Sequence, residues 1–210
     1  MDLASFIKQY GIGLTGGIAT GKSTVAKIIQ AEEYSVFDAD ILARQAVEVG
    51  SPTLAALVGL CGKHILGKDA QLDRQMLGSL IFADKDLRLQ VVPLIQQRIW
   101  ELLEERIRLL GEATKPRHWF FDAALLCESG SYKRFAQIWL TVCPESVQRQ
   151  RLIARDHFNP AYAKQVIASQ FSNEHKKKLA DVIIDTAQPA ALVRQLVLKH
   201  LGSLLPGLVA

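Results

Sequence analysis

A glycine-rich stretch near the start of the chain, LTGGIATGKST at positions 14–24, constrains the fold more than any other feature. It matches the Walker A pattern G-x-x-x-x-G-K-[ST], with Gly16, Gly21, Lys22 and Ser23 at the defined positions. The glycines let the backbone turn so that successive N–H groups face one anion, and the following helix adds its positive N-terminal end. We therefore predict binding of a nucleoside triphosphate, with Lys22 on the β- and γ-phosphates and the Ser23 hydroxyl on Mg²⁺.

Short apolar runs alternate with helical patterns along the chain, and the first run leads directly into the glycine-rich stretch. The strands expected from these runs cover residues 10–15, 35–37, 119–121, 138–142 and 182–184. Alternation of this kind predicts βαβ units and a parallel sheet covered on both faces. The expected fold class is α/β, a three-layer α/β/α P-loop NTPase fold with a five-stranded parallel sheet.

Two spans depart from the simple alternation. Residues 41–115 show no strand pattern and contain a long helical stripe, while residues 149–178 are polar and rich in Arg and Lys. We predict a single P-loop kinase domain over residues 1–210. Its expected parts are a nucleotide-binding core (about 1–45, 116–148 and 179–210), a helical acceptor-binding insertion (about 46–115) and an arginine-rich lid (about 149–178). A final amphipathic helix is expected between Leu192 and Leu205.

The remaining motifs favour a metabolite kinase over other users of nucleotides. The chain contains neither Asn-Lys-x-Asp nor Asp-x-x-Gly, which GTPase switches normally carry. Asp122 follows the third apolar run but is followed by Ala123, so it only partly matches the acidic pair of motor and transport ATPases. A small core with two insertions instead suits an enzyme in which one insertion holds the acceptor and the other closes over it.

Two aspartates follow the second predicted strand, as Asp38-Ala39-Asp40. Ligands of parallel α/β sheets bind at the carboxyl ends of the strands, so we expect this segment near the phosphate loop. Asp38 is expected mainly to cap the helix that begins near Ile41. For Asp40 we favour a catalytic role, in which it orients an acceptor hydroxyl and accepts its proton.

Several segments beyond the loop resemble the dephospho-coenzyme A kinase family, and the resemblance covers nearly the whole chain. It includes the double glycine at the start of the loop and the combination of Asp-Ala-Asp-x-x-x-Arg with Ala-Asp-x-x-Ile-Asp. The matching segments are VFDADILAR (36–44), LDR (72–74), IFAD (81–84), LLCE (125–128), QRQRLIARD (148–156) and ADVIID (180–185). The resemblance implies Mg²⁺-dependent transfer of the ATP γ-phosphoryl group to the ribose 3′-hydroxyl of dephospho-CoA.

The resemblance also implies roles for individual residues. Asp40 would be the catalytic carboxylate, assisted by Lys22 and Arg151, and Arg44 and Arg74 would join Asp40 on the acceptor side. The residues implied to bind ATP phosphates and Mg²⁺ are Gly16, Gly17, Ile18, Ala19, Thr20, Gly21, Lys22, Ser23 and Thr24, with Arg151 and Arg155 from the lid.

The lid arginines have a physical rationale of their own. Arg151 and Arg155 are spaced i,i+4 and so share one side of a helix, where a planar guanidinium can hold two phosphoryl oxygens at once. A solvated helix face is the alternative reading, and it is favoured for Arg149. The run Lys176–Lys178 is expected to be solvated surface.

Three positions depart from the family pattern. Val92 stands where the family has the histidine of His-Pro, Ala124 replaces the proline of Pro-Leu-Leu, and Thr186 replaces an asparagine after the last strand near the expected adenine site. Two alternatives stay open beside the leading interpretation: another small-metabolite or nucleoside kinase of this fold, and a non-catalytic nucleotide sensor.

Composition limits the partners and the compartment. The formal net charge of +4 suits small polyanions but does not by itself argue for nucleic acid. No run approaches the roughly 18 apolar residues of a membrane span. The three cysteines have no metal-type spacing, which favours reduced thiols. We expect a cytoplasmic monomer or small homo-oligomer whose partners are ATP and dephospho-CoA, without nucleic-acid or membrane partners.

Overall fold

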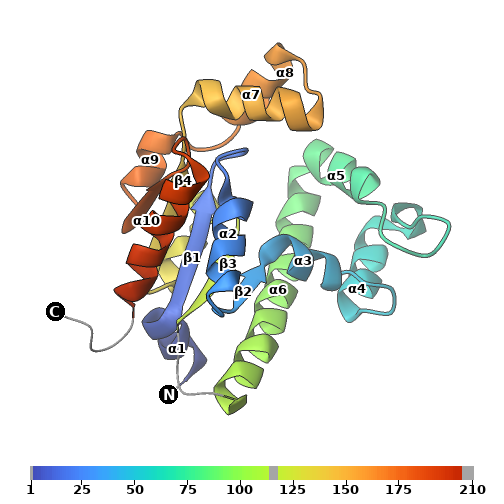
Figure 1. Cartoon of the computed structure of the whole chain (residues 1–210). Helices are drawn as coiled ribbons and strands as arrows, with labels where there is room; N and C mark the ends of the chain where they lie inside the picture. Colours follow the sequence, from blue (N-terminus) through green and yellow to red (C-terminus); the bar gives the residue numbers. More distant parts are fainter. Residues whose placement is uncertain (1, 114–117, 205–210) are drawn as a thin grey trace. The chain divides into compact units, whose positions relative to one another are not determined.

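A computed structural model describes residues 2–113 and 118–204, and its centre is a five-stranded parallel sheet of order β2-β3-β1-β4-β5 (Figure 1). The strands are β1 (Gly11–Gly16), β2 (Val36–Asp38), β3 (Trp119–Asp122), β4 (Gln137–Val142) and β5 (Val182–Asp185). Each predicted strand is present with bounds within one residue of the expected ones, and the α/β fold class is confirmed.

The chain divides into two compact units, one formed by Met1–Phe37 with Pro116–Ala210 and the other by Asp38–Lys115. The first unit contains the sheet, apart from Asp38 at the end of β2, and its covering helices. These are α1 (Leu3–Tyr10), α2 (Lys22–Ala31), η2 (Ser131–Arg134), α7 (Glu145–Asp156), α8 (Pro160–Ala168), α9 (Asn173–Lys177) and α10 (Ala190–Gly202). The final helix is present as α10, and Leu205 lies outside the described residues.

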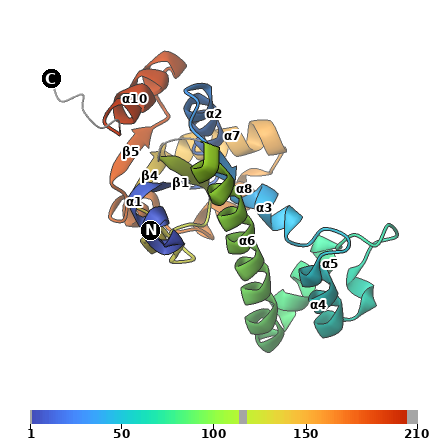
Figure 2. The same ribbon diagram turned by 90° about the horizontal axis from the view of Figure 1, so that it is seen from below.

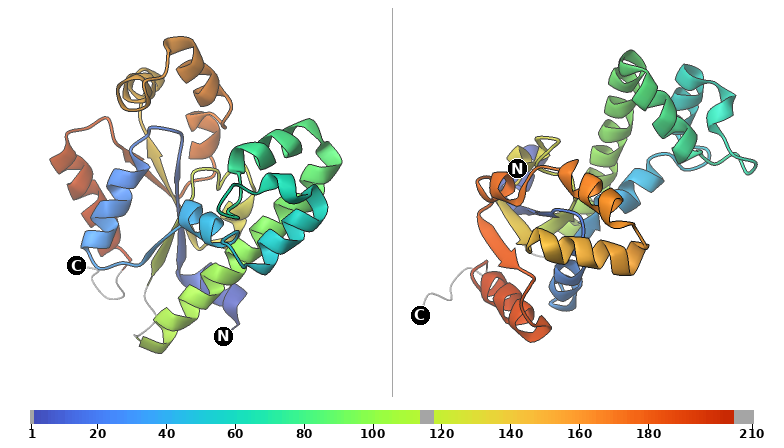
Figure 3. Two further views of the ribbon diagram at one scale, coloured as in Figure 1. Left: turned by 90° about the vertical axis from the view of Figure 1, so that its right-hand side faces the viewer. Right: turned by 90° about the horizontal axis from the view of Figure 1, so that it is seen from above.

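The core of the first unit lies where α2 and α10 pack on one face of the sheet (Figures 1 and 2). Every residue of β1 is buried, as expected for the central strand of a parallel sheet covered on both faces. Ile12, Phe120 and Trp139 come from three adjacent strands and are fully buried in this core. Helices α7 and α8 lie side by side, as Figure 3 shows from above.

The second unit is helical, with α3 (Ala39–Gln45), α4 (Pro52–Cys61), η1 (Lys63–Ile65), α5 (Arg74–Ala83) and the long α6 (Lys85–Ala113). Capping side chains set where these helices begin, because each accepts a backbone N–H that the first turn leaves unpaired. The caps are Asp38 for α3, Ser51 for α4, Asp73 for α5 and Asp84 for α6. A separate apolar core, which includes Leu57, Leu77 and Val91, holds this unit together.

Candidate active site

The glycine-rich stretch forms the loop between β1 and α2. Gly21 has a φ of 86° and immediately precedes α2, and this left-handed conformation is one that glycine adopts without strain. A Cβ on Gly21 would also lie 3.1 Å from the side chain of Thr186. Behind the loop, the hydroxyls of Thr20 and Thr141 lie 2.8 Å apart in the buried interior. Residues of the loop are therefore also constrained by contacts with the rest of the protein, here with Thr186 and Thr141.

Several backbone N–H groups of this loop are unpaired. Among the residues that the structure describes, none accepts a hydrogen bond from the backbone N–H of Ala19, Gly21, Lys22 or Ser23. The first turn of α2 adds the positive end of the helix dipole at the same place. Unpaired N–H groups at a helix N-terminus form an anion site, so this geometry can hold phosphate oxygens.

Lys22 forms an ion pair with Asp122 at the end of β3. The side chain of Asp122 is only 6% exposed, whereas that of Lys22 is 18% exposed. Strand β3 pairs with β1 in parallel, with Asp122 in register with Leu14, and this pairing brings the carboxylate to the loop. In the sequence Asp122 only partly matches an acidic motif, and that motif does not indicate the contact with Lys22.

Arg151 on α7 binds carbonyl groups beside the loop. One guanidinium nitrogen donates to the carbonyl of Ala19 at 3.1 Å, and the other donates to the carbonyl of Thr186 at 2.8 Å. The buried hydroxyl of Thr186 in turn donates to the carbonyl of Thr20. Thr186 therefore links Arg151 to the phosphate loop, a role that its place at the end of β5 did not reveal.

The thiol of Cys143 lies next to Arg151, with 3.7 Å between its Sγ and the guanidinium. Burial raises the pKa of Cys143, against the opposing effects of the Arg151 charge and of a hydrogen bond with Thr186. The neutral thiol adds no negative charge at the place where phosphate oxygens would approach.

Two glutamine side chains hydrogen-bond to the backbone of Ile18 in the loop. The side-chain oxygen of Gln170 accepts the Ile18 N–H at 2.7 Å, and the side-chain amide of Gln148 donates to the Ile18 carbonyl at 2.7 Å. Both glutamines, together with Gly17, line a cavity of about 290 Å³ beside the loop. Gln148 begins the family-like segment 148–156, whereas Gln170 carries no motif, and only the tertiary fold brings both side chains to Ile18.

The other lid arginines are placed differently. Arg155 forms two hydrogen bonds with the neighbouring Asp156, at 2.9 and 2.8 Å, and these bonds lower the pKa of that carboxyl group. The Arg155 side chain is 64% exposed, and Arg149 is also exposed. The structure thus brings Arg151 to the loop and leaves Arg155 paired with Asp156 on the surface.

The candidate acceptor residues lie in the second unit. Asp38 accepts the N–H groups of Asp40 and Ile41 at 2.7 and 3.2 Å, so its expected capping role is confirmed. Asp40 is exposed in the first turn of α3, and no described residue donates a hydrogen bond to its carboxylate. Arg74 donates to the carbonyl of Ala43 at 3.3 Å, which places it beside the exposed Arg44.

The other two departures from the family pattern are at Val92 and Ala124. Val92 is half-buried on α6, where it replaces an imidazole with an apolar side chain. The carbonyl of Ala124 accepts a hydrogen bond from the Thr15 hydroxyl at 3.2 Å, a backbone contact that does not depend on the side chain.

Comparison with known proteins identifies the family. A model of the dephospho-CoA kinase family matches residues 10–191. The chain belongs to the dephospho-CoA kinase family. A dephospho-CoA kinase of Shouchella clausii is 41% identical over 174 residues, which cover 83% of this chain and 88% of that protein.

Two solved structures share the fold of this chain. The TT1252 protein of Thermus thermophilus superposes with a TM-score of 0.81 at 27% identity, covering 94% of this chain and 98% of that one. A dephospho-CoA kinase from Campylobacter jejuni superposes with a TM-score of 0.68 at 25% identity, covering 92% and 96%. The resemblance to dephospho-CoA kinases drawn from the sequence motifs is confirmed.

Proposed function

We propose that this chain transfers the γ-phosphoryl group of ATP to the ribose 3′-hydroxyl of dephospho-CoA, giving coenzyme A in the last step of its synthesis. The observation that carries the proposal is the loop with unpaired N–H groups flanked by Lys22 and Arg151, in a chain of the dephospho-CoA kinase family. A loop of this kind suits a polyphosphate, and the family membership indicates the acceptor.

Positioning and electrostatics supply most of the rate in this reaction class. The unpaired backbone N–H groups of the loop hold the phosphates, and Lys22 moves from Asp122 to the β- and γ-phosphate oxygens. Arg151 offsets charge on the transferring group, and Arg155 joins it when its pair with Asp156 opens. A cation fixed in this way contributes roughly 3–4 kcal/mol to transition-state stabilisation.

On the acceptor side, Asp40 aligns the 3′-hydroxyl and accepts its proton as the bond to phosphorus forms. Its exposed carboxylate has no hydrogen-bond donor among the described residues, so it is available to a substrate hydroxyl. Arg44 and Arg74 bind anionic groups of dephospho-CoA. The helical segment 46–115 holds the acceptor and the segment 149–178 acts as the lid.

The residues at the loop are compatible with Mg²⁺. The described residues contain no cluster of three or more His, Cys, Asp or Glu side chains able to hold a metal. Mg²⁺ needs no such cluster when phosphate oxygens and water supply most ligands, and the exposed Ser23 hydroxyl provides a protein ligand. Bound there, Mg²⁺ neutralises phosphate charge.

We also assign the protein to the cytoplasm as a monomer or small homo-oligomer. All its cysteines are free, which suits a reducing compartment. None of the helices in the described part of the chain is long and apolar enough to cross a membrane.

The proposal is tested by following ADP release from Mg-ATP with and without dephospho-CoA, with the product mass read in parallel. We expect ADP release that depends on dephospho-CoA, and a product heavier by one phosphoryl group. ADP release with a different acceptor would indicate another small-metabolite or nucleoside kinase. Binding of ATP without any transfer would indicate a nucleotide sensor.

A further inference from the structure

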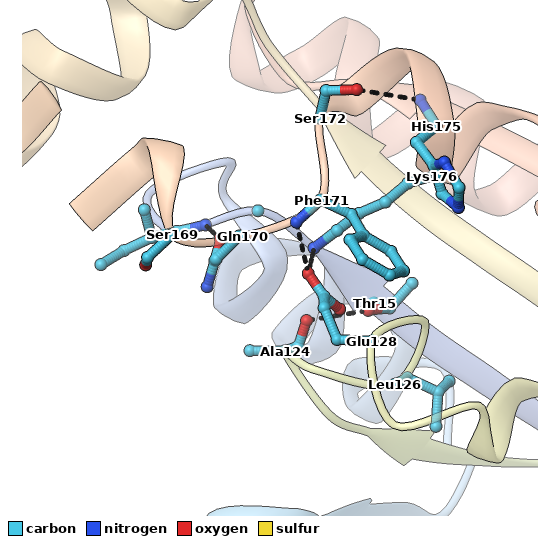
Figure 4. Close-up of polar contacts among 12 residues, drawn as sticks. Thr15, Ala124, Leu126, Glu128, Ser169, Gln170, Phe171, Ser172, His175 and Lys176 are labelled. Carbon is cyan, nitrogen blue, oxygen red and sulfur yellow. Dashed lines mark hydrogen bonds and ion pairs between the residues drawn. The ribbon is translucent and has the colours of Figure 1, made fainter. Parts of the chain in front are cut away.

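Lys176 on α9 is a buried cation. Its side chain is 0% exposed, and its Nζ lies 2.9 Å from Oε1 of Glu128, which is 17% exposed (Figure 4). The expectation that the run Lys176–Lys178 is solvated surface is therefore wrong for Lys176. The adjacent Lys177 does lie at the surface, where it pairs with the exposed Glu174.

The same carboxylate oxygen holds the backbone of the segment between α8 and α9. Oε1 of Glu128 accepts the N–H of Phe171 at 3.0 Å, as the converging dashed lines in Figure 4 show. The residue before Phe171 is Gln170, whose side-chain oxygen accepts the N–H of Ile18 in the phosphate loop. A continuous set of contacts thus runs from Lys176 through Glu128 and the 170–171 backbone to the loop.

Stability is a weak reason for burying this ion pair. Removing two charges from water costs several kcal/mol each, and apolar side chains of similar volume often stabilise a fold equally well. The pair is also incompletely satisfied, because no donor in the described part of the chain reaches the buried Oε2 of Glu128. What the pair does provide is a carboxylate held in one place.

We propose that Glu128 and Lys176 are positioning residues for phosphoryl transfer. Lys176 fixes the carboxylate of Glu128, the carboxylate fixes the backbone of Phe171, and Gln170 is thereby held on the Ile18 N–H. The Ile18 peptide precedes Ala19, whose own N–H is one of the unpaired donors of the loop. This inference rests on the proposed function, since it concerns the geometry from which the γ-phosphoryl group is transferred.

The decisive comparison is between Glu128→Leu and the double variant Glu128→Leu/Lys176→Met. The single variant leaves Lys176 buried without a counter-charge, so we expect both its thermal stability and its kcat to fall. The double variant removes both charges and keeps the volume, so we expect stability to recover. Because the tether to Phe171 is still absent, we expect its kcat to remain about tenfold or more below that of the wild type.

Two further variants separate positioning from folding. Gln170→Ala removes the contact with Ile18 and leaves the ion pair in place, so we expect a similar loss of kcat at unchanged melting temperature. Lys177→Met is the matched control on the same helix, and we expect it to change neither quantity. Recovery of wild-type kcat in the double variant would show that the ion pair serves folding alone and would overturn the proposal.

A readout without turnover keeps this inference distinct from the proposed function. Amide hydrogen exchange at Ile18 is expected to be faster in Glu128→Leu/Lys176→Met and in Gln170→Ala than in the wild type. If the wild-type chain transferred no phosphoryl group to dephospho-CoA, the proposed function would fail, while exchange at Ile18 would still test the tether. Unchanged exchange in both variants would refute it.

Discussion

Lys22 of the phosphate loop forms an ion pair with Asp122, the last residue of the neighbouring strand β3. The carboxylate is almost completely buried, and it holds the lysine head group at the carboxyl ends of the strands. In the proposed function, ATP competes with this carboxylate for the ammonium group of Lys22.

We expect Asp122→Asn to bind metal-free ATP about three- to tenfold more tightly than the wild type, because a nearby like charge is worth on the order of 1 kcal/mol. The measurement is calorimetric titration with EDTA present. Asp2→Asn makes the same charge change at the N-cap of α1, where asparagine caps as well as aspartate does, and we expect it to leave affinity unchanged. Weaker binding by Asp122→Asn would show that Asp122 assists the nucleotide.

Substitutions of the two aspartates at the start of α3, Asp38 and Asp40, are expected to affect different properties of the protein. Asp40→Asn should lower kcat by about 100-fold or more, because the proton acceptor is lost, with little change in unfolding free energy. Asp38→Ala should instead lower the unfolding free energy by about 1 kcal/mol, because the α3 cap is lost. Steady-state kinetics and urea titration of both variants check this, and near-normal turnover by Asp40→Asn would exclude it as the base.

Arg151 is expected to be intolerant of lysine. Its two guanidinium nitrogens reach the carbonyls of Ala19 and Thr186, and a single ammonium cannot span both positions. We expect Arg151→Lys to lower kcat by about 100-fold. Arg149→Lys is the control, since Arg149 is exposed on the same helix, and it should behave as the wild type. Equal effects of the two substitutions would argue against a special role for Arg151.

The cysteines give a prediction for pH dependence. Burial raises the pKa of both Cys127 and Cys143, so the folded state keeps these thiols protonated where the unfolded chain has lost the proton. The unfolding free energy should therefore decrease as pH rises above the ordinary thiol pKa of roughly 8.5.

Iodoacetamide at neutral pH should modify the half-buried Cys61 first, as peptide mass mapping can show. Modification of Cys143 before Cys61 would contradict the buried environment described for it.

The strands could be predicted because a parallel sheet covered on both faces requires short, uninterrupted apolar segments, and the five runs supply them. The cap at Asp38 was equally accessible, since an aspartate before a helical pattern has a local role. These features depend on neighbours along the chain. The catalytic and substrate-binding roles assigned to Asp40, Arg44, Arg74 and Arg155 remain predictions.

Contacts between distant segments could not be predicted in the same way. Nothing in a run of three lysines indicates that Lys176 is the one buried, because its counter-charge, Glu128, lies on the segment after β3. Gln170 carries no motif, and the family-like segment that begins at Gln148 does not indicate a contact with Ile18. That shared contact is formed only when α7 and the 169–172 segment lie against the loop.

The order of segments along the chain has a consequence for synthesis on the ribosome. Strand β1 lies at the centre of the sheet, yet its partners β3 and β4 are translated only after the whole helical unit of residues 38–115. That unit is contiguous and has its own apolar core, so it can fold as it emerges. Until β3 and β4 have been synthesised, β1 has no strand to pair with, and the phosphate loop that follows it cannot reach its folded position. Chaperone protection of the first 37 residues would therefore matter most during this interval.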